Sequence, residues 1–82
     1  MRNHTIVNKR GSSETWAADV IAGGRFALRV SVRTKDGVKT VRIRRIDDQG
    51  RTGKLIAVRS SEKGRPLGMD AIEDLIEGEL DA

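Results

Sequence analysis

The sequence contains no cysteine. Without cysteine, neither a disulfide framework nor a cysteine zinc site can supplement the core of this 82-residue chain, which is long enough for one small domain. No apolar run approaches the roughly 20 residues that span a bilayer. Residues 1–10 also lack the apolar segment and cleavage site of a signal peptide. We therefore expect a cytoplasmic protein with no membrane partner.

Residues suited to catalysis are equally scarce. His4 is the only histidine, and it lies in residues 1–4, which we expect to form a disordered tail. The segment GRTGKL (50–55) departs from the P-loop pattern, because the glycine spacing differs and leucine follows the lysine. The adjacent carboxylates of Asp47 and Asp48 are typical of a solvated turn. The sequence therefore predicts no enzymatic activity, no cofactor and no metal.

What the chain does contain is positive charge, distributed unevenly. All 16 Lys and Arg residues lie within residues 1–65, which hold six acidic residues and carry a formal charge of +10. Residues 66–82 hold the other six acidic residues and no basic one. A basic body with an acidic end indicates a polyanionic partner for the body, although charge that only maintains solubility would give the same count.

Residues 26–46 show the clearest structural pattern, two alternating runs around Asp36-Gly37. The alternation predicts two strands, whose apolar side chains share one face: Phe26, Leu28, Val30, Val32, Val41 and Ile43. Asp36 and Gly37 tolerate positive φ and suit a two-residue type I′ turn. With these two residues at the centre of the turn, Lys35 pairs with Val38 and Arg29 pairs with Arg44. A slip of one residue would scramble both faces.

The other face of this hairpin carries four arginines: Arg29, Arg33, Arg42 and Arg44. Like charges directly across an antiparallel pair are destabilising, and no acidic residue interrupts these positions within the hairpin. An anionic partner would offset the repulsion, and guanidinium groups match phosphate in geometry and charge. We therefore predict a nucleic-acid-binding surface, with Arg51, Lys54 and Arg59 at its rim. The alternative is a solvated outer face covered by arginine stems.

The C-terminal half predicts one more strand and a helix. Leu55 to Arg59 reads as a strand with Ile56 and Val58 on the core face, and residues 61–68 read as a loop. From residue 69 to residue 80 the apolar spacing is helical, with a stripe formed by Met69, Ile72, Leu75, Ile76 and Leu80. We expect this stripe to cover the apolar face of the sheet, with the acidic side of the helix pointing away from the arginines.

The N-terminal third leaves two possibilities open. Residues 13–22 form either a helix closed by Gly23 or a strand that turns through Gly23-Gly24 into the next strand. The diglycine favours the strand. Thr5 to Asn8 is consistent with a short edge strand. Residues 5–60 would then form an antiparallel sheet.

The segment RVSVRTKDGVKTVRIRRIDDQGRTGKLIAV (29–58) resembles two known folds. It is similar to the curved-sheet core of the Positive Cofactor Four family, whose members bind single-stranded DNA, end in one helix and act as dimers. The same strands plus helix also resemble the three-stranded arm-binding domains of integrases, which place a sheet in the major groove. Both resemblances imply nucleic acid as the partner.

Together these patterns predict a single α+β domain over residues 1–82, an antiparallel sheet of three to five strands with one C-terminal helix on its apolar face. The main alternative is an α-β-β-β-α order. For function we predict non-enzymatic binding of DNA or RNA through phosphate contacts. The rival hypothesis is a protein-interaction or regulatory module that uses the acidic helix or an open sheet edge. A homodimer is a further possibility.

Overall fold

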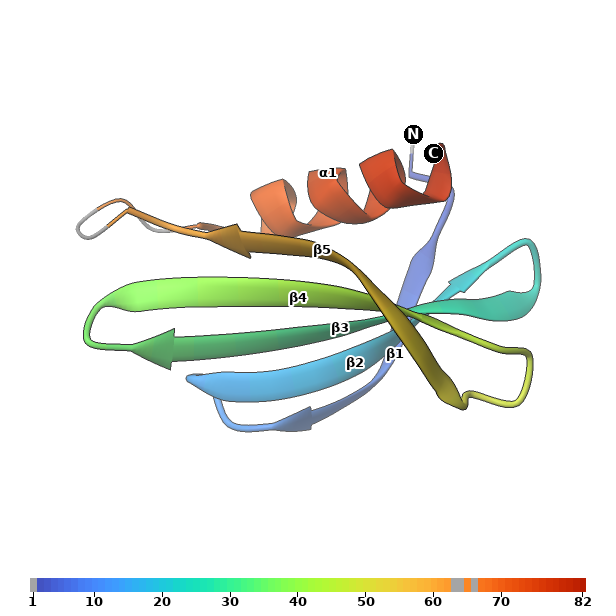
Figure 1. Cartoon of the computed structure of the whole chain (residues 1–82), viewed down its shortest axis with the longest axis horizontal. Coiled ribbons are helices and arrows are strands. Elements are labelled where there is room, and N and C mark those ends of the chain that lie inside the picture. The colour runs from blue at the N-terminus through green and yellow to red at the C-terminus, as the bar shows by residue number, and fades with distance from the viewer. Residues whose placement is uncertain (1, 63–64, 66) are drawn as a thin grey trace.

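The computed structural model describes residues 2–62, 65 and 67–82. It contains five strands and one helix: β1 (Thr5–Gly11), β2 (Thr15–Ala22), β3 (Arg25–Lys35), β4 (Val38–Ile46), β5 (Thr52–Ser60) and α1 (Met69–Leu80). The strands form one antiparallel sheet in sequence order, and α1 lies across one face of it (Figure 1). The predicted α+β fold is confirmed. Among the described residues, no helix has the length and apolar character needed to cross a membrane.

The β3–β4 hairpin has the predicted turn and register. Asp36 and Gly37 have φ values of 53° and 78°, as a type I′ turn requires. Lys35 pairs with Val38 and Arg29 with Arg44, so the alternation of both strands stays in phase across the hairpin.

The core lies between the sheet and α1. From the helix it contains Ile72 and Ile76, which are 1% and 0% exposed. From β2, β3 and β4 it contains Trp16, Ala18, Val20, Leu28, Val30, Val32, Val41 and Ile43. The helix covers the range that the apolar spacing predicts, and we call the side of the sheet that it covers the helix face.

The ambiguous N-terminal third is strand, not helix. β2 pairs with β3 along its whole length, and Gly23 and Gly24, with φ values of 62° and 76°, form the turn between them. The α-β-β-β-α order is therefore wrong. β1 extends to Gly11, three residues further than expected, and pairs with β2 as an edge strand.

Phe26, which was predicted in the core, lies on the side of the sheet away from α1, which we call the open face. A register shift after Val20 pairs Ile21 with Phe26, so Phe26 shares a face with Ile21 instead of with Leu28. An irregularity of this kind inserts a residue and reverses the alternation beyond it.

The predicted faces are reversed over residues 57–59 of β5, whereas Ile56 packs against the core as predicted. Val58 pairs with Arg42 and is 53% exposed on the open face, whereas Ala57 pairs with the core residue Ile43. Ile56 is partly buried and packs against the core cluster, next to a register shift. Both alternations of β5 contain apolar residues, so the hydrophobic pattern alone could not choose between them.

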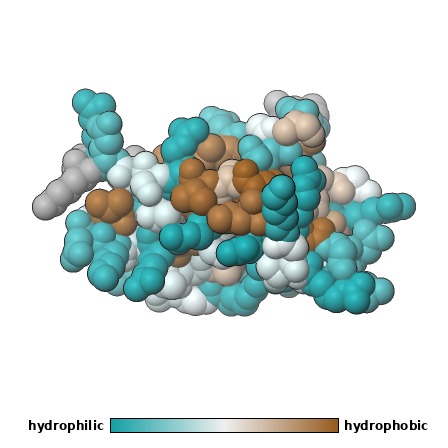
Figure 2. Space-filling view, viewed as in Figure 1, coloured by the Kyte–Doolittle hydropathy of each residue, from teal (hydrophilic) through white to brown (hydrophobic). Residues whose placement is uncertain are grey.

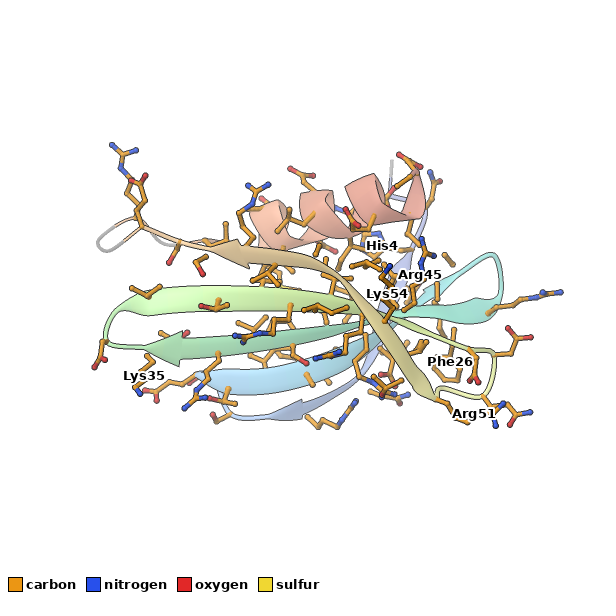
Figure 3. The ribbon with its side chains drawn as sticks, in the orientation of Figure 1. His4, Phe26, Lys35, Arg45, Arg51 and Lys54 are labelled. Carbon is orange, nitrogen blue, oxygen red and sulfur yellow. The ribbon has the colours of Figure 1, made fainter. Side chains whose placement is uncertain are left out.

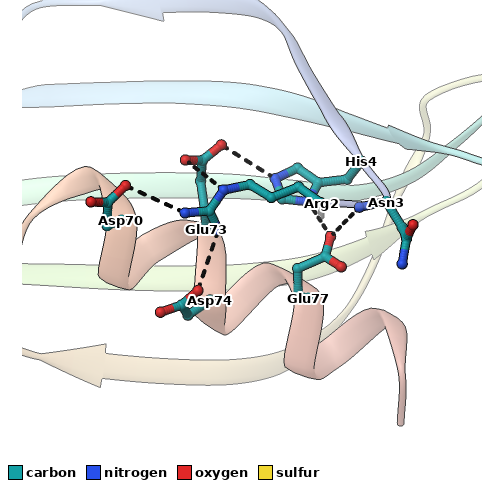
Figure 4. Close-up of polar contacts among 7 residues, drawn as sticks. All are labelled: Arg2, Asn3, His4, Asp70, Glu73, Asp74 and Glu77. Carbon is teal, nitrogen blue, oxygen red and sulfur yellow. Dashed lines mark hydrogen bonds and ion pairs between the residues drawn. The ribbon is translucent and has the colours of Figure 1, made fainter.

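Residues 2–4, expected as a disordered tail, instead lie against α1 (Figure 4). The guanidinium group of Arg2 is 3.3 to 3.4 Å from three helix carboxylates, those of Asp70, Glu73 and Asp74. His4, with a side chain only 1% exposed, contacts Glu77 through Nδ1. The rest of the tail prediction (residue 1) and part of the loop predicted at 61–68 (residues 63–64 and 66) fall outside the described residues.

Candidate nucleic-acid interface

The open face of the sheet carries the four arginines of the hairpin. Arg29 pairs with Arg44, Ser31 with Arg42 and Arg33 with Thr40. Because directly opposed residues of an antiparallel pair share a face, all four guanidinium groups project from the side of the sheet away from α1. Each of the four arginines lies on a strand that has a neighbour on both sides, so backbone pairing fixes the position of its Cα atom.

The side chain of Arg29 is held by contacts to two other strands, β2 and β5, and to the β4–β5 loop. Its Nε lies 2.9 Å from Oδ1 of Asp19, which is opposite Arg29 on β2. Its Nη2 donates to the carbonyl oxygen of Gly50 at 2.8 Å, and its Nη1 donates to the hydroxyl of Thr52. The side chain is only 22% exposed. Arg29 therefore connects β2 and the β4–β5 loop.

Asp19 is the anion at the centre of this network. It is 6% exposed, and it also accepts from Asn8 at 3.2 Å and from Arg10 at 3.5 Å. Burial by itself would raise the pKa of Asp19, but the hydrogen bonds from Arg29 and Asn8 and the charges of Arg29 and Arg10 outweigh it and hold the pKa below the ordinary value. The carboxylate therefore stays charged at neutral pH.

Asp19 also bears on the like-charge repulsion that the sequence predicts across the hairpin. The pairing of Arg29 with Arg44 does create a like-charge contact across the hairpin, but Asp19 on the neighbouring strand offsets it from within the chain. The repulsion is therefore no evidence for an external anion by itself. An external anion is indicated only by arginines that Asp19 does not contact.

Three arginines meet that condition. Within the described part of the chain, Arg33, Arg42 and Arg44 make no side-chain hydrogen bond and no ion pair. Arg33 and Arg42 are exposed, and Arg44 is partly buried between β3 and β5. We call these three residues the open arginines.

The three predicted rim residues lie in different parts of the structure. Arg51 is exposed at the β4–β5 loop (Figure 3). Its Nε lies 2.7 Å from Oδ2 of Asp47. The backbone N–H of Arg51, followed by its side chain, lowers the pKa of Asp47. Lys54 is exposed in the irregular part of β5, where the register assigns it to neither face.

Arg59 lies on the helix face. It pairs with the core residue Val41 and lines a groove against Ala71 and Leu75 of α1. It cannot act together with the open arginines, because the sheet separates them. The reversed alternation over residues 57–59 places Arg59 on the helix face, and it places Val58 on the open face.

The structure adds Arg10 and a hollow that the sequence analysis did not identify. Arg10, Ala17, Ser31 and Arg42 are paired in turn across four strands, so they form one row on the open face. The two small side chains in the middle of the row leave a hollow of about 380 Å³, also lined by Thr15 and Arg33. The sequence alone could not place Arg10 beside Ala17, because that pairing depends on the β1–β2 register.

Apolar side chains border the charged part of this face. Figure 2 shows a hydrophobic patch over β5 and the adjoining strand, surrounded by hydrophilic side chains. Val58 and Leu55 of β5 are 53% and 36% exposed, and each pairs with one of the open arginines, Arg42 and Arg44. Phe26, the second residue of β3, lies at one end of the sheet (Figure 3).

No group of three or more metal-ligating side chains occurs among the described residues. Compared with known proteins, the chain matches no family model, no curated sequence and no solved structure.

Proposed function

We propose that this protein binds DNA or RNA without catalysing a reaction, and that the open arginines supply its main phosphate contacts. The observation that carries the proposal is that these three guanidinium groups share one face of a rigid sheet and have no internal partner among the described residues. A guanidinium group donates two parallel hydrogen bonds to a phosphate, which makes arginine well suited to this contact.

The rest of the open face supports the same partner. The exposed hydroxyl group of Thr15 lies opposite Arg33 on the same face, and such groups commonly donate to phosphate oxygens. The exposed apolar side chains of β5 would contact sugar or base surfaces. The resemblance of residues 29–58 to the Positive Cofactor Four and integrase arm-binding folds points to nucleic acid as well.

A protein-interaction module is the second candidate, because β5 is an edge strand with a hydrophobic patch beside it (Figure 2). An exposed edge strand can pair with another chain, including a second copy of this protein in a homodimer. The acidic side of α1 is a weaker candidate for such a site, because Arg2 and His4 already contact four of its carboxylates.

A salt titration of nucleic-acid affinity tests the proposal. Single- and double-stranded DNA and RNA oligonucleotides would be titrated with the protein by fluorescence anisotropy at about 50 and 200 mM salt. Three phosphate contacts predict a slope of log K against log salt of roughly −2 to −3. An absence of binding to every oligonucleotide at the lower salt would overturn the proposal and favour the protein-interaction module.

A further inference from the structure

The hollow over Ala17 and Ser31 is a feature that phosphate binding alone does not use. Its floor consists of two small side chains directly opposite each other on β2 and β3. Arginines stand on both sides of this floor in the same row, Arg10 on β1 and Arg42 on β4. The depression exists because long side chains flank short ones on a regular sheet, so it needs no conformational change to open.

The chemistry differs between the floor and the rim. The floor is a methyl group and a hydroxymethyl group above backbone that is already paired within the sheet, so it is flat and has few free donors. The rim is cationic, with Arg33 and Arg42 unpaired among the described residues. Arg10 is less available to a ligand, because it donates to the carbonyl oxygen of Asn8 at 2.8 Å and lies 3.5 Å from Asp19.

On this basis we propose that the hollow is a subsite for one nucleotide unit, with the base over Ala17 and Ser31 and the adjacent phosphate between Arg33 and Arg42. This rests on the proposed function and deepens it. The volume of about 380 Å³ lies in the range of small-ligand pockets. A planar ring fits a flat floor, and arginine side chains can stack on the ring or bind the phosphate.

The proposal makes base and phosphate contacts separable, because filling the hollow leaves every charge in place. Ser31 is exposed, so Ser31→Leu would occupy the hollow without entering the core. Ser60→Leu is a matched control, because Ser60 is an exposed serine on the same face and does not line the hollow. Ser31→Val, a smaller side chain with high strand propensity, provides a second filling variant if the leucine variant folds poorly.

The experiment compares an intact oligonucleotide with one that carries abasic sites at several positions, so that the sugar-phosphate backbone is kept and bases are removed. For the unmodified protein we expect the abasic oligonucleotide to bind about tenfold more weakly, within the range measured for loss of one stacked base. Ser31→Leu should weaken binding of the intact oligonucleotide by a similar factor and remove most of the difference between the two. Its salt slope should stay unchanged, and Ser60→Leu should behave like the unmodified protein.

Other results would overturn either the subsite alone or the proposed function as well. Equal affinity of the unmodified protein for intact and abasic oligonucleotides would overturn the subsite, and so would unchanged binding by both filling variants. In either case the phosphate-binding function would stand. No binding of the intact oligonucleotide at low salt would instead overturn the proposed function, and the subsite with it.

Discussion

The carboxylates of the protein are distributed unevenly between the two faces of the sheet, and so are the contacts that they make with basic side chains. On the helix face, Arg2 is within 3.4 Å of three carboxylates of α1, and His4 is buried against a fourth, Glu77. On the open face, one carboxylate, Asp19, serves Arg29 and Arg10, while the open arginines have no partner among the described residues.

The difference shows which charges have a structural role. A cation matched within the chain connects elements that are distant in the sequence, as Arg2 joins the N-terminal segment to α1 and Arg29 joins β2 to the β4–β5 loop. A cation without a partner contributes little to folding, since even exposed ion pairs contribute only about 0–1 kcal/mol. The open arginines are therefore available to an external ligand on the open face, as Arg45 and Arg59 are on the helix face, since neither has a side-chain partner among the described residues.

The largest difference between a paired and an unpaired arginine is expected for Arg29 and Arg44, which lie opposite each other in one hairpin. Arg29→Gln removes the closest partner of the buried carboxylate of Asp19 and two further hydrogen bonds. We expect it to lower the free energy of unfolding by about 2–3 kcal/mol. Arg44→Gln should change it by less than about 0.5 kcal/mol. Urea unfolding of both variants measures the difference.

Arg44→Gln is itself the control in that comparison, because the chemical change and the position across the hairpin are matched. Equal losses of stability in the two variants would show that Asp19 does not distinguish them. A gain of stability in Arg29→Gln would show that relief of the cross-strand repulsion outweighs the network.

The hairpin and helix could be predicted from sequence because their signals are local. Asp36-Gly37 permits one turn type, and that turn determines the pairing of every residue in β3 and β4. The apolar spacing of α1 similarly identifies Ile72 and Ile76 as buried. Phe26 and Val58 were placed on the wrong face because each lies in a strand whose pairing contains a register shift, and alternation cannot reveal where a residue is inserted.

The candidate site was predictable only in part, for a related reason. The four arginines of one hairpin could be placed on one face without knowing any other contact. The partner of Arg29 could not be identified, because Asp19 lies on a strand whose very existence was uncertain and whose register depends on a long-range contact. Arg10 and the hollow were missed for the same reason, since they depend on the pairing of β1 with β2.

The next largest effect should appear in binding. Arg42→Gln combined with Arg44→Gln removes two of the open arginines, so the salt slope should become shallower by about 1.4–1.8, two phosphate contacts' worth. The control is Arg45→Gln combined with Arg59→Gln, which removes the same charge from residues paired with Leu28 and Val41 of the helix face. Salt titrations of both double variants make the measurement. Identical slopes would mean that net charge, not the open face, determines binding.

Acid should weaken both internal networks. Hydrogen bonding to His4, followed by the backbone N–H of Asn3, lowers the pKa of Glu77 from its ordinary value of 4.5, and the pKa of Asp19 is lowered from 3.8. A carboxyl group with a lowered pKa stabilises the fold above its ordinary pKa, and this stabilisation is lost as the pH falls through the lowered value. The free energy of unfolding contributed by these groups should therefore be constant from neutral pH to about pH 5.5 and decline below about pH 4.5.

Two variants distinguish the contributions of the two faces to this acid-induced loss of stability. Urea unfolding at a series of pH values should show a smaller acid-induced loss for Glu77→Gln, which removes the helix-face contribution, and for Asp19→Asn, which removes the open-face contribution. Both variants should be less stable than the unmodified protein at neutral pH. An acid-induced loss of the original size in both variants would show that other carboxyl groups dominate.

The smallest effect is expected from the helix acids on nucleic-acid binding. Glu73 and Glu77 already contact Arg2 and His4 (Figure 4), and α1 lies behind the sheet as seen from the open arginines. Glu73→Gln combined with Glu77→Gln raises the net charge by two, but charges separated by more than about 10 Å are largely screened at 0.1 M salt. We expect less than about a twofold change in affinity and no change in salt slope in the same titration. Binding that responded to these acids and ignored Arg42 and Arg44 would place the nucleic acid on the helix face, and the division between matched and open cations would then have no bearing on ligand binding.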